Sequence, residues 1–183
     1  MLFRSEALGR RFTEMIEPYR YPAGGLPEEQ AMEIRRMKAR VDAERLPRGA
    51  DRALHTKLGT GGLADVEWTI QLLQLQHAGA VPELRTPSTL DAITAAAGVG
   101  LLEASDADDL VAGWTMATRA RAATTLARGK PGDQLPSSGR ELAAVASILG
   151  YPPDTDPGEF LDDYRRVTRH ARAVVDRVFY LVD

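Results

Sequence analysis

The residues best suited to chemistry in this sequence gather in one stretch, "TKLGTGGLADVEWTIQLLQLQHAG", at positions 56–79. A lysine precedes three glycines, two carboxylates and a glutamine follow, and an apolar run begins beside them. The residues in question are Lys57, Gly59, Gly61, Gly62, Asp65, Glu67 and Gln71. A glycine-rich turn that leads into a helix can hold a phosphate through backbone N–H groups, so the known phosphate-binding motifs are the first comparison.

Two of those motifs do not fit. Gly59-x-Gly61-x-x-Ala64 has the form of the dinucleotide fingerprint, but that fingerprint needs a strand before the turn and a βαβ unit around it. The preceding residues, "ADRALHTKL", are charged and not strand-like. A P-loop needs Gly-Lys-Ser/Thr after the glycines, whereas Lys57 comes before them.

Two interpretations of the turn remain open. The N–H groups of Gly61, Gly62 and Leu63 would carry positive partial charge at a helix N-terminus near Lys57, which is a weak anion site. Alternatively, the glycines only form a sharp turn, and the two carboxylates complement the helix dipole. These carboxylates, two residues apart, point about 200° away from each other on a helix, so a shared metal ion is not expected. On the residues alone, the plain helix start is favoured.

Metal and cysteine chemistry are not expected elsewhere. The three histidines, His55, His77 and His170, have no ligand-like spacing, and the chain contains no cysteine. Two D-x-D strings occur, at 106–108 and 154–156. The first reads as a helix start and the second as a Pro/Gly loop, so both are expected to be structural, and we predict no metal site.

Arginines recur along the C-terminal segment "FLDDYRRVTRHARAVVDRVFY". Such a run is usually a solvated helix face, and docking to an acidic partner is the alternative. The docking candidates are Arg165, Arg166, Arg169 and Arg172. The basic run at 34–45, "IRRMKARVDAER", is interpreted in the same way, as a solvated face.

Helical periodicity runs through almost the whole chain, and no segment alternates convincingly as a strand. The helices are expected at about 2–20, 28–46, 63–78, 88–98, 105–129, 139–150 and 159–181, with Ser88 and Ser105 as N-caps and Gly98, Gly129 and Gly150 as C-caps. The first helix places Phe3, Leu8, Phe12, Met15, Ile16 and Tyr19 roughly on one stripe, and Trp68 and Trp114 should lie in the core. The sequence predicts an all-α class: one bundle of about six to seven helices over residues 1–183.

Composition limits the cellular setting. The net charge is -3, so no global basic field exists to hold nucleic acid or an anionic membrane. No apolar stretch approaches the roughly 20 residues of a membrane span, and the charged N-terminus is no signal peptide. Together with the absence of cysteine, these features predict a soluble cytoplasmic protein.

The string Lys57-x-Gly59-x-Gly61-Gly62-x-x-Asp65-x-Glu67-Trp68-x-x-Gln71 resembles a known signature. It is similar to "K-x-G-x-GG-[IL]-x-[DE]-[IV]-E-[FW]-x-x-Q" of the glutamine synthetase adenylyltransferase family, in the helical domain that follows each nucleotidyltransferase domain. The similarity continues through "LLQLQHAG", "LRTPSTLDAI", "LP", "LGY" and the arginine-bearing segment. The "ADVEW" wording resembles the C-terminal, adenylylating half, and the composition resembles that of actinobacterial members.

This resemblance implies that the chain is the nucleotidyltransferase-associated helical domain of a longer enzyme. The whole enzyme would transfer AMP from ATP to a tyrosine of glutamine synthetase, and also remove it, with ATP and Mg²⁺ held by an upstream domain. No catalytic residue is then expected in this chain, which alone should be inactive and bind no cofactor. The residues of the signature, from Lys57 to Gln71, would lie near the nucleotide or at the interdomain surface, and the partners of its carboxylates would lie outside the chain.

Two alternatives remain open. The chain could be a non-catalytic binding module for glutamine synthetase, the PII signal protein or glutamine, which the arginine-bearing helix motivates. It could also come from a PII uridylyltransferase, because that family has the same type of helical domain.

Overall fold

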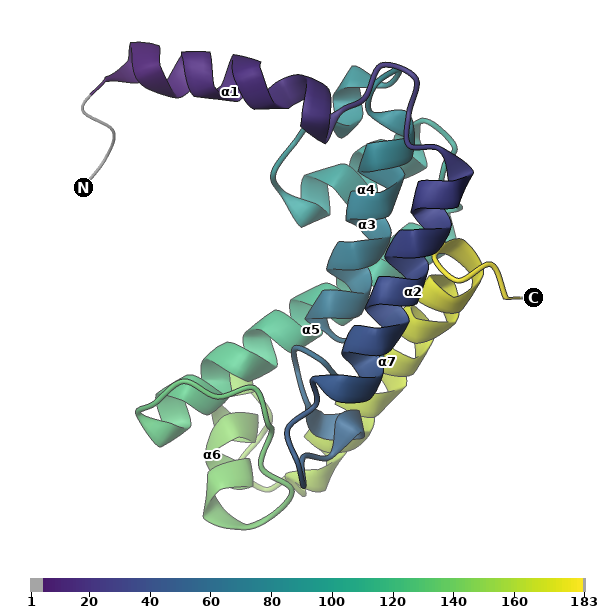
Figure 1. Ribbon diagram of the computed structural model, residues 1–183. Helices are drawn as coiled ribbons and strands as arrows, with labels where there is room; N and C mark the ends of the chain where they lie inside the picture. Colours follow the sequence, from purple (N-terminus) through teal and green to yellow (C-terminus); the bar gives the residue numbers. More distant parts are fainter. Residues whose placement is uncertain (1–4, 183) are drawn as a thin grey trace.

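The computed structural model of the protein describes residues 5–182 (Figure 1). Within them the helices are α1 (Glu6–Arg20), α2 (Glu28–Glu44), α3 (Leu63–His77), α4 (Thr89–Gly98), α5 (Ala104–Arg128), α6 (Gly139–Leu149) and α7 (Gly158–Val178). Two short 3-10 turns, η1 (Arg52–Leu54) and η2 (Pro82–Leu84), lie in the connections. This part of the chain contains no strand, and one isolated bridge joins His55 to Gln134. The predicted all-α class is confirmed, while the single domain over residues 1–183 stays a prediction.

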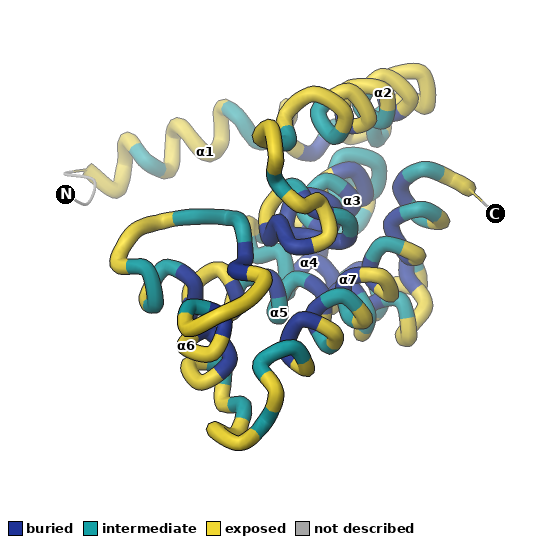
Figure 2. The backbone as a smooth tube through the Cα atoms, turned by 90° about the horizontal axis from the view of Figure 1, so that it is seen from below, coloured by how far each residue is buried: buried dark blue, intermediate teal, exposed yellow. Residues whose placement is uncertain are grey.

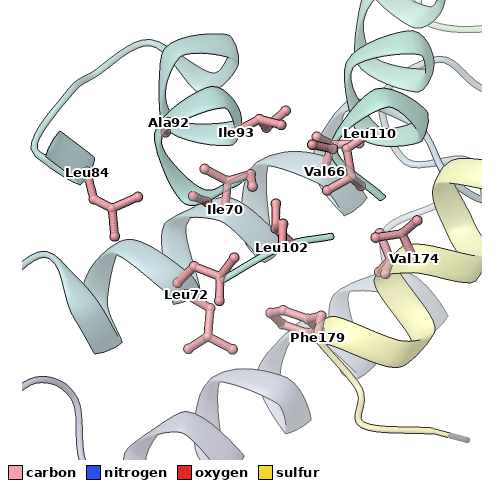
Figure 3. Packing of buried hydrophobic residues seen from close by; sticks show 14 of the residues in the cluster. Val66, Ile70, Leu72, Leu84, Ala92, Ile93, Leu102, Leu110, Val174 and Phe179 are labelled. Carbon is pink, nitrogen blue, oxygen red and sulfur yellow. The ribbon is translucent and has the colours of Figure 1, made fainter. Parts of the chain in front are cut away.

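The first hydrophobic core surrounds α3. Val66 and Ile70 of α3 pack with Leu110 of α5 and with Val174 and Phe179 at the end of α7, and all five are buried (Figure 3). Burying one such side chain contributes about 1.5–3 kcal/mol. The predicted apolar stripes of α3 and α7 therefore form this core, and α3 is fixed between the other helices.

A second core lies at the other end of the two long helices. There Ala120 of α5, Leu142 and Val145 of α6, and Phe160 and Tyr164 of α7 are buried together. The helices α5 and α7 run through both cores (Figure 1). They are the shared frame on which the glycine turn before α3 rests.

Helix ends follow the predicted caps in part. The Ser88 hydroxyl accepts a hydrogen bond from the N–H of Asp91, and Gly129 and Gly150 end their helices in the left-handed conformation, as predicted. Ser105, however, lies inside α5, whose N-cap is Glu103. Gly98 lies inside α4, because the left-handed turn after that helix comes later, at Gly100 with φ 76°.

The apolar stripe of the first helix is not buried. Leu8, Phe12, Met15 and Tyr19 are 64%, 56%, 62% and 82% exposed, and no residue of α1 is buried. Figure 2 shows α1 as a mostly exposed arm that extends from the rest of the chain. Periodicity identifies an amphipathic helix but not the surface that covers its apolar side. Phe3 of the predicted stripe lies outside the described residues.

The base of α1 is held firmly. Tyr21 is buried, and Arg85 lies over its ring with 5.7 Å between the guanidinium carbon and the ring centroid. Arg85 also donates to the carbonyls of Ala78 and Gly79. The arm therefore leaves the body from a fixed point. Among the helices described, none is both long and apolar enough to cross a membrane.

Candidate functional site

The glycines of the turn bring it into close contact with its neighbours. Gly61 has φ 65°, and a Cβ atom there would lie 1.8 Å from the carbonyl oxygen of Thr168 in α7. At Gly59 and Gly62 a Cβ atom would lie 2.2 Å and 2.7 Å from backbone oxygens of the same loop. A side chain at Gly61 would push the turn away from α7, and side chains at Gly59 and Gly62 would distort the loop itself, so the glycines serve the fold.

The backbone donors of the turn are already engaged. The N–H of Gly61 donates to Oδ2 of Asp65 at 2.8 Å, and the N–H of Gly62 donates to the Gly59 carbonyl at 3.0 Å. The N–H of Leu63 donates to the Thr56 carbonyl at 3.0 Å. An anion would have to displace all three bonds. The occupied donors favour the plain helix start over the weak anion site, and a position of these residues near a nucleotide or at an interdomain surface stays a prediction.

Asp65 lies at the centre of a buried charge network. Its Oδ1 lies 2.5 Å from Nζ of Lys38 in α2, and its Oδ2 lies 3.1 Å from a guanidinium nitrogen of Arg172 in α7. Lys38 also pairs with Asp42 at 2.6 Å, and Arg172 pairs with Asp176 at 2.8 Å. The network joins α2, α3 and α7 directly below the glycine turn.

Two expectations are wrong at this network. The partners of Asp65 lie inside the chain, not outside it. The basic run at 34–45 is not solvated throughout, because Lys38 is only 1% exposed. A signal was present in the sequence: Asp65, Thr69 and Leu72 share one buried face of α3, and a carboxylate on a buried face needs a cationic partner.

Two more groups are tuned by this environment. Tyr180 donates its hydroxyl to Oδ2 of Asp42 at 3.1 Å, and burial, followed by the nearby Asp42 charge, raises the pKa of Tyr180. On the other side of the turn, Nδ1 of His55 accepts from the N–H of Leu58 at 3.0 Å. Burial lowers the pKa of His55 below 6.5, so the ring stays neutral and keeps that bond.

The remaining signature residues point away from the network. Lys57 and Gln71 are exposed, Glu67 is half-buried, and none of these side chains makes a hydrogen bond or ion pair with the rest of the described chain. Glu67 and Gln71 are one helical turn apart on α3, so they share a face. They are the polar groups that the signature leaves free for other contacts.

Glu67 stands between two clefts. Cleft A, of about 380 Å³, lies between the base of α1 and the helices α3 and α4, and Arg20, Gln71 and Ser88 are among its lining residues. Cleft B, of about 570 Å³, lies along α5 and is lined by Leu63, Trp114 and Leu126, among others.

Cleft B also contains unsatisfied polar atoms. Nε1 of Trp114 and Oγ1 of Thr118 are buried without a hydrogen-bond partner. Trp114 is half-buried rather than fully in the core, and so is Trp68. The clefts have no counterpart in the sequence interpretation, because they form between helices that are far apart along the chain.

The four docking candidates on α7 divide into three kinds. Arg165 and Arg166 pair locally with Asp162 and Asp163, at 3.3 Å and 2.8 Å. Arg172 belongs to the buried network. Arg169 is exposed and pairs with no carboxylate among residues 5–182. Partner docking by these arginines stays a prediction.

The structure brings no metal-binding cluster together within the described residues, since no three His, Asp or Glu side chains converge there. The first D-x-D string starts with Asp106, which pairs with Arg177 at 2.5 Å. The second ends with Asp156, which accepts from the N–H of Gly158 at 2.9 Å. Both acidic residues have structural partners, in agreement with the sequence interpretation.

Comparison with known proteins places these features in a family. Residues 35–179 match the family model described as GlnD PII-uridylyltransferase. The chain is 61% identical over 175 residues to the bifunctional glutamine synthetase adenylyltransferase/adenylyl-removing enzyme of Streptomyces avermitilis. The aligned region covers 96% of this chain and 17% of that enzyme. It is 60% identical over 172 residues to the enzyme of that name from Mycobacterium avium, covering 94% of this chain and 17% of the relative.

A third relative of the same name, from Nocardia farcinica, is 56% identical over 174 residues, with 95% of this chain and 17% of the relative covered. The chain thus spans about one sixth of the length of these curated relatives. The matched segment includes the whole signature and the network around Asp65. The chain therefore belongs to the family described as GlnD PII-uridylyltransferase, and its similarity to glutamine synthetase adenylyltransferases of actinobacteria extends over almost its whole length.

Proposed function

We propose that this chain is the helical domain of an enzyme that adenylylates and de-adenylylates glutamine synthetase and thereby regulates nitrogen assimilation. Within that enzyme, the chain would support the nucleotidyltransferase domain through Lys57, Glu67 and Gln71. The observation that carries the proposal is that Glu67 and Gln71 line clefts A and B without an internal partner among the described residues, while Lys57 is exposed in the loop before α3. The relatives, which bear that activity in their names, extend far beyond the part that this chain matches.

The chain's own residues do not fit a Mg²⁺–ATP site. The backbone N–H groups of the turn are bonded internally, and Asp65 is neutralised by Lys38 and Arg172. No cluster of carboxylates is available among residues 5–182 to hold a metal ion. In this proposal the nucleotide and its metal ion would bind to another part of the enzyme.

The free residues suit contact with a neighbouring domain. Glu67 can accept hydrogen bonds or pair with a cation, Gln71 can donate and accept, and Lys57 supplies a positive charge. Cleft B adds apolar surface from Leu63 and the exposed Leu126. Apolar surface with a few polar groups at its edge is the usual composition of an interface between protein domains.

The test is an assay of AMP incorporation from ATP into glutamine synthetase. The full-length enzyme should be active, and the 183-residue chain alone should not be. In the full-length enzyme, the double substitution Glu67→Gln and Gln71→Ala should lower kcat about tenfold without changing the melting temperature, which corresponds to about 1.4 kcal/mol of transition-state stabilisation.

Glu44→Gln is the matched control, because Glu44 is exposed on α2 and makes no ion pair within the described chain. Its kcat should equal that of the unsubstituted enzyme. Adenylylation of glutamine synthetase by the isolated chain, or an unchanged kcat in the Glu67/Gln71 variant, contradicts the proposal.

A second candidate function follows from the family model, whose description names a PII uridylyltransferase. The two activities are separated by offering the full-length enzyme glutamine synthetase with ATP and, in parallel, PII protein with UTP. We expect label transfer only to glutamine synthetase. Transfer to PII alone would favour the uridylyltransferase.

A non-catalytic binding role for the chain is the third candidate, motivated by the exposed Arg169. Calorimetric titration of the chain with glutamine synthetase, PII protein and glutamine measures each interaction separately. Binding heat with one of them would identify a regulatory partner. Absence of heat with all three leaves the interdomain role alone.

A further inference from the structure

We propose that a groove between α7 and the loop containing Thr60 binds a short acidic peptide segment of a partner protein. This groove, which we call the arginine groove, is lined by Arg52, Thr60, Arg165, Arg169 and Arg172. It shares no residue with clefts A and B, so it does not depend on the interdomain contact or on AMP transfer.

Two adjoining hollows make up the arginine groove. The larger has a volume of about 630 Å³ and the smaller about 130 Å³, and Thr60 lines both. One wall is α7, where Arg165, Arg169 and Arg172 follow one another at helical spacing. The facing wall carries Arg52 and Thr60. A ligand would therefore meet guanidinium groups from both walls in the larger hollow, and from the α7 wall alone in the smaller hollow.

Positive charge without an acidic partner collects at the end with the smaller hollow. Arg169 has no carboxylate partner among the described residues, and Arg165 has only an exposed pair with Asp162 at 3.3 Å. Arg52 lines the larger hollow instead, where it donates to the backbone carbonyl of Asp42 rather than to a carboxylate. Exposed pairs such as that of Arg165 contribute little and exchange readily with a better partner.

The other end of the groove has a different character. Asp42 and Asp176 line it, but each already pairs with a cation, Lys38 at 2.6 Å and Arg172 at 2.8 Å. Lys38 and Arg172 are thereby neutralised, which leaves Arg52 as the cation lining that end without a carboxylate partner among the described residues. The groove is therefore suited to a short anionic segment and not to a long polyanion, which the net charge of -3 also disfavours.

The spacing of the arginines selects the form of the ligand. Arg165 and Arg169 are four residues apart on α7, which corresponds to about 6 Å along the helix axis. In an extended peptide, alternate side chains lie about 6.6 Å apart on one face. Carboxylates at alternate positions can thus each meet one guanidinium group, and arginine binds carboxylates through two parallel hydrogen bonds. The hydroxyl of Thr60, which makes no hydrogen bond with another described residue, adds a donor between the walls.

The chain offers a matched control on the same helix. Arg166 follows Arg165 directly, is of the same residue type and lies 56% exposed, but it pairs with Asp163 at 2.8 Å. Asp163 in turn accepts from the hydroxyl of Tyr151 at 2.8 Å. Arg166 lines neither hollow of the arginine groove. Its removal lowers the net charge by one, half the change of the Arg165/Arg169 double variant, without changing the groove.

The experiment measures fluorescence anisotropy of a labelled, capped eight-residue peptide of alternating glutamate and serine, titrated with the 183-residue chain at low salt. Arg165→Ala with Arg169→Ala should weaken binding about tenfold or more, because two charge-assisted contacts are lost. Arg166→Ala should change it less than about twofold. Thr60→Val should weaken it about two- to threefold, because one neutral hydrogen bond is lost.

A conservative variant separates the effect of the guanidinium geometry on binding from the effects of lost charge and of misfolding. Arg165→Lys with Arg169→Lys keeps both charges but removes the planar fork, and its affinity should fall between those of the unsubstituted chain and the double alanine variant. Thermal unfolding of each variant establishes that the chain remains folded. A peptide of alternating glutamine and serine should not bind.

Four outcomes would overturn the proposal. The glutamate peptide does not bind the unsubstituted chain, or Arg166→Ala weakens binding as much as the Arg165/Arg169 variant. An oligouridylate of equal charge binds more tightly than the peptide through the same arginines, which would assign the groove to nucleic acid. Inorganic phosphate binds at these arginines while the peptide does not, which would assign it to a small anion.

Discussion

The signature segment consists of two halves that face different surroundings. Gly59, Gly61, Gly62 and Asp65 are buried and contact the loop, α2 and α7, whereas Lys57, Glu67 and Gln71 face clefts or solvent. Asp65 and Glu67 illustrate the division, because they are two residues apart on α3 and therefore point about 200° away from each other. The first carboxylate has two cationic partners within the chain, and the second has none among the described residues.

The two halves of the signature therefore have different roles, one in the fold and one in contacts with a partner. The buried half fixes the position of α3 on α2 and α7. In the free half, Glu67 and Gln71 lie on the face of α3 that remains accessible, and Lys57 lies in the loop before α3. Substitutions in the buried half should therefore change the stability of the isolated chain. Substitutions in the free half should leave stability unchanged and act only where a partner is present.

The largest expected effect is that of Gly61→Ala. The new Cβ atom would lie 1.8 Å from the Thr168 carbonyl oxygen, and φ 65° is strained for any residue with a Cβ atom. The strain and the displacement of backbone together should cost about 4 kcal/mol of unfolding free energy. Urea denaturation followed by circular dichroism measures this loss.

Gly100→Ala is the control for the strain alone. Gly100 has φ 76°, but nothing lies within 4 Å of a Cβ atom built there. Its cost should be about 1 kcal/mol. Equal losses at Gly61 and Gly100 would show that the turn does not rest on α7 as described.

The next largest effect is expected for Asp65→Asn. The substitution places an amide beside Lys38 and Arg172 and leaves each of them with one carboxylate partner, Asp42 and Asp176 respectively. Loss of a buried ionic partner typically costs about 3 kcal/mol. Chemical denaturation of the isolated chain gives the value.

A double-mutant cycle with Lys38→Met tests whether the loss belongs to the pair. The double variant should be more stable than the sum of the two single losses predicts, by about 1 kcal/mol or more, because neither group is left buried alone. Asp162→Asn, which removes the exposed pair with Arg165, should cost less than about 0.5 kcal/mol. Additive losses at Asp65 and Lys38 would refute the network as a coupled unit.

A smaller effect is expected from protonation of His55. Burial lowers the pKa of His55 below 6.5, so the unfolded chain binds a proton there more readily than the folded chain. The stability that the neutral ring contributes is present above about pH 6.5 and is lost as the pH falls toward the pKa of the folded state. The melting temperature should therefore decrease when the pH is lowered from 7.5 to 5.5.

His55→Asn provides the comparison, because the Asn side-chain oxygen can accept from the N–H of Leu58 as Nδ1 does but does not titrate. The fall in melting temperature over this pH range should be smaller in the variant than in the unsubstituted chain. His77 and His170 are present in both proteins, so their contributions cancel in the difference. An equal fall in both would show that His55 does not control the acid sensitivity.

The sequence allowed the class, the helices and much of the core to be predicted, because these depend on local periodicity. The stripes of α3 and α7 that contain Ile70 and Tyr164 are buried as expected. The ion pair between Lys38 and Asp65 could not be derived in this way, since it joins residues 27 positions apart in the chain. Its existence depends on how α2 crosses α3, which local patterns do not determine.

The exposure of α1 and the arrangement of the candidate site could not be predicted from the sequence, for related reasons. An apolar stripe such as Leu8, Phe12 and Met15 indicates that a helix face can be buried, but it does not indicate whether this chain buries it. The glycines gave correct evidence for a turn, yet only the hydrogen-bond partners of Gly61 and Leu63 show that its donors are occupied. The free half of the signature could be identified only after the buried half had been assigned.

The smallest expected effect lies in that free half. Glu67→Gln with Gln71→Ala removes no hydrogen bond or ion pair within the described chain, so the unfolding free energy of the isolated chain should change by less than about 0.5 kcal/mol. The same pair of substitutions is expected to lower the turnover of the full-length enzyme. Denaturation of the isolated chain therefore measures what the activity assay cannot, namely whether these side chains contribute to the fold. A loss comparable to that at Asp65 would remove the distinction between the two halves, and an unchanged free energy together with reduced turnover would establish it.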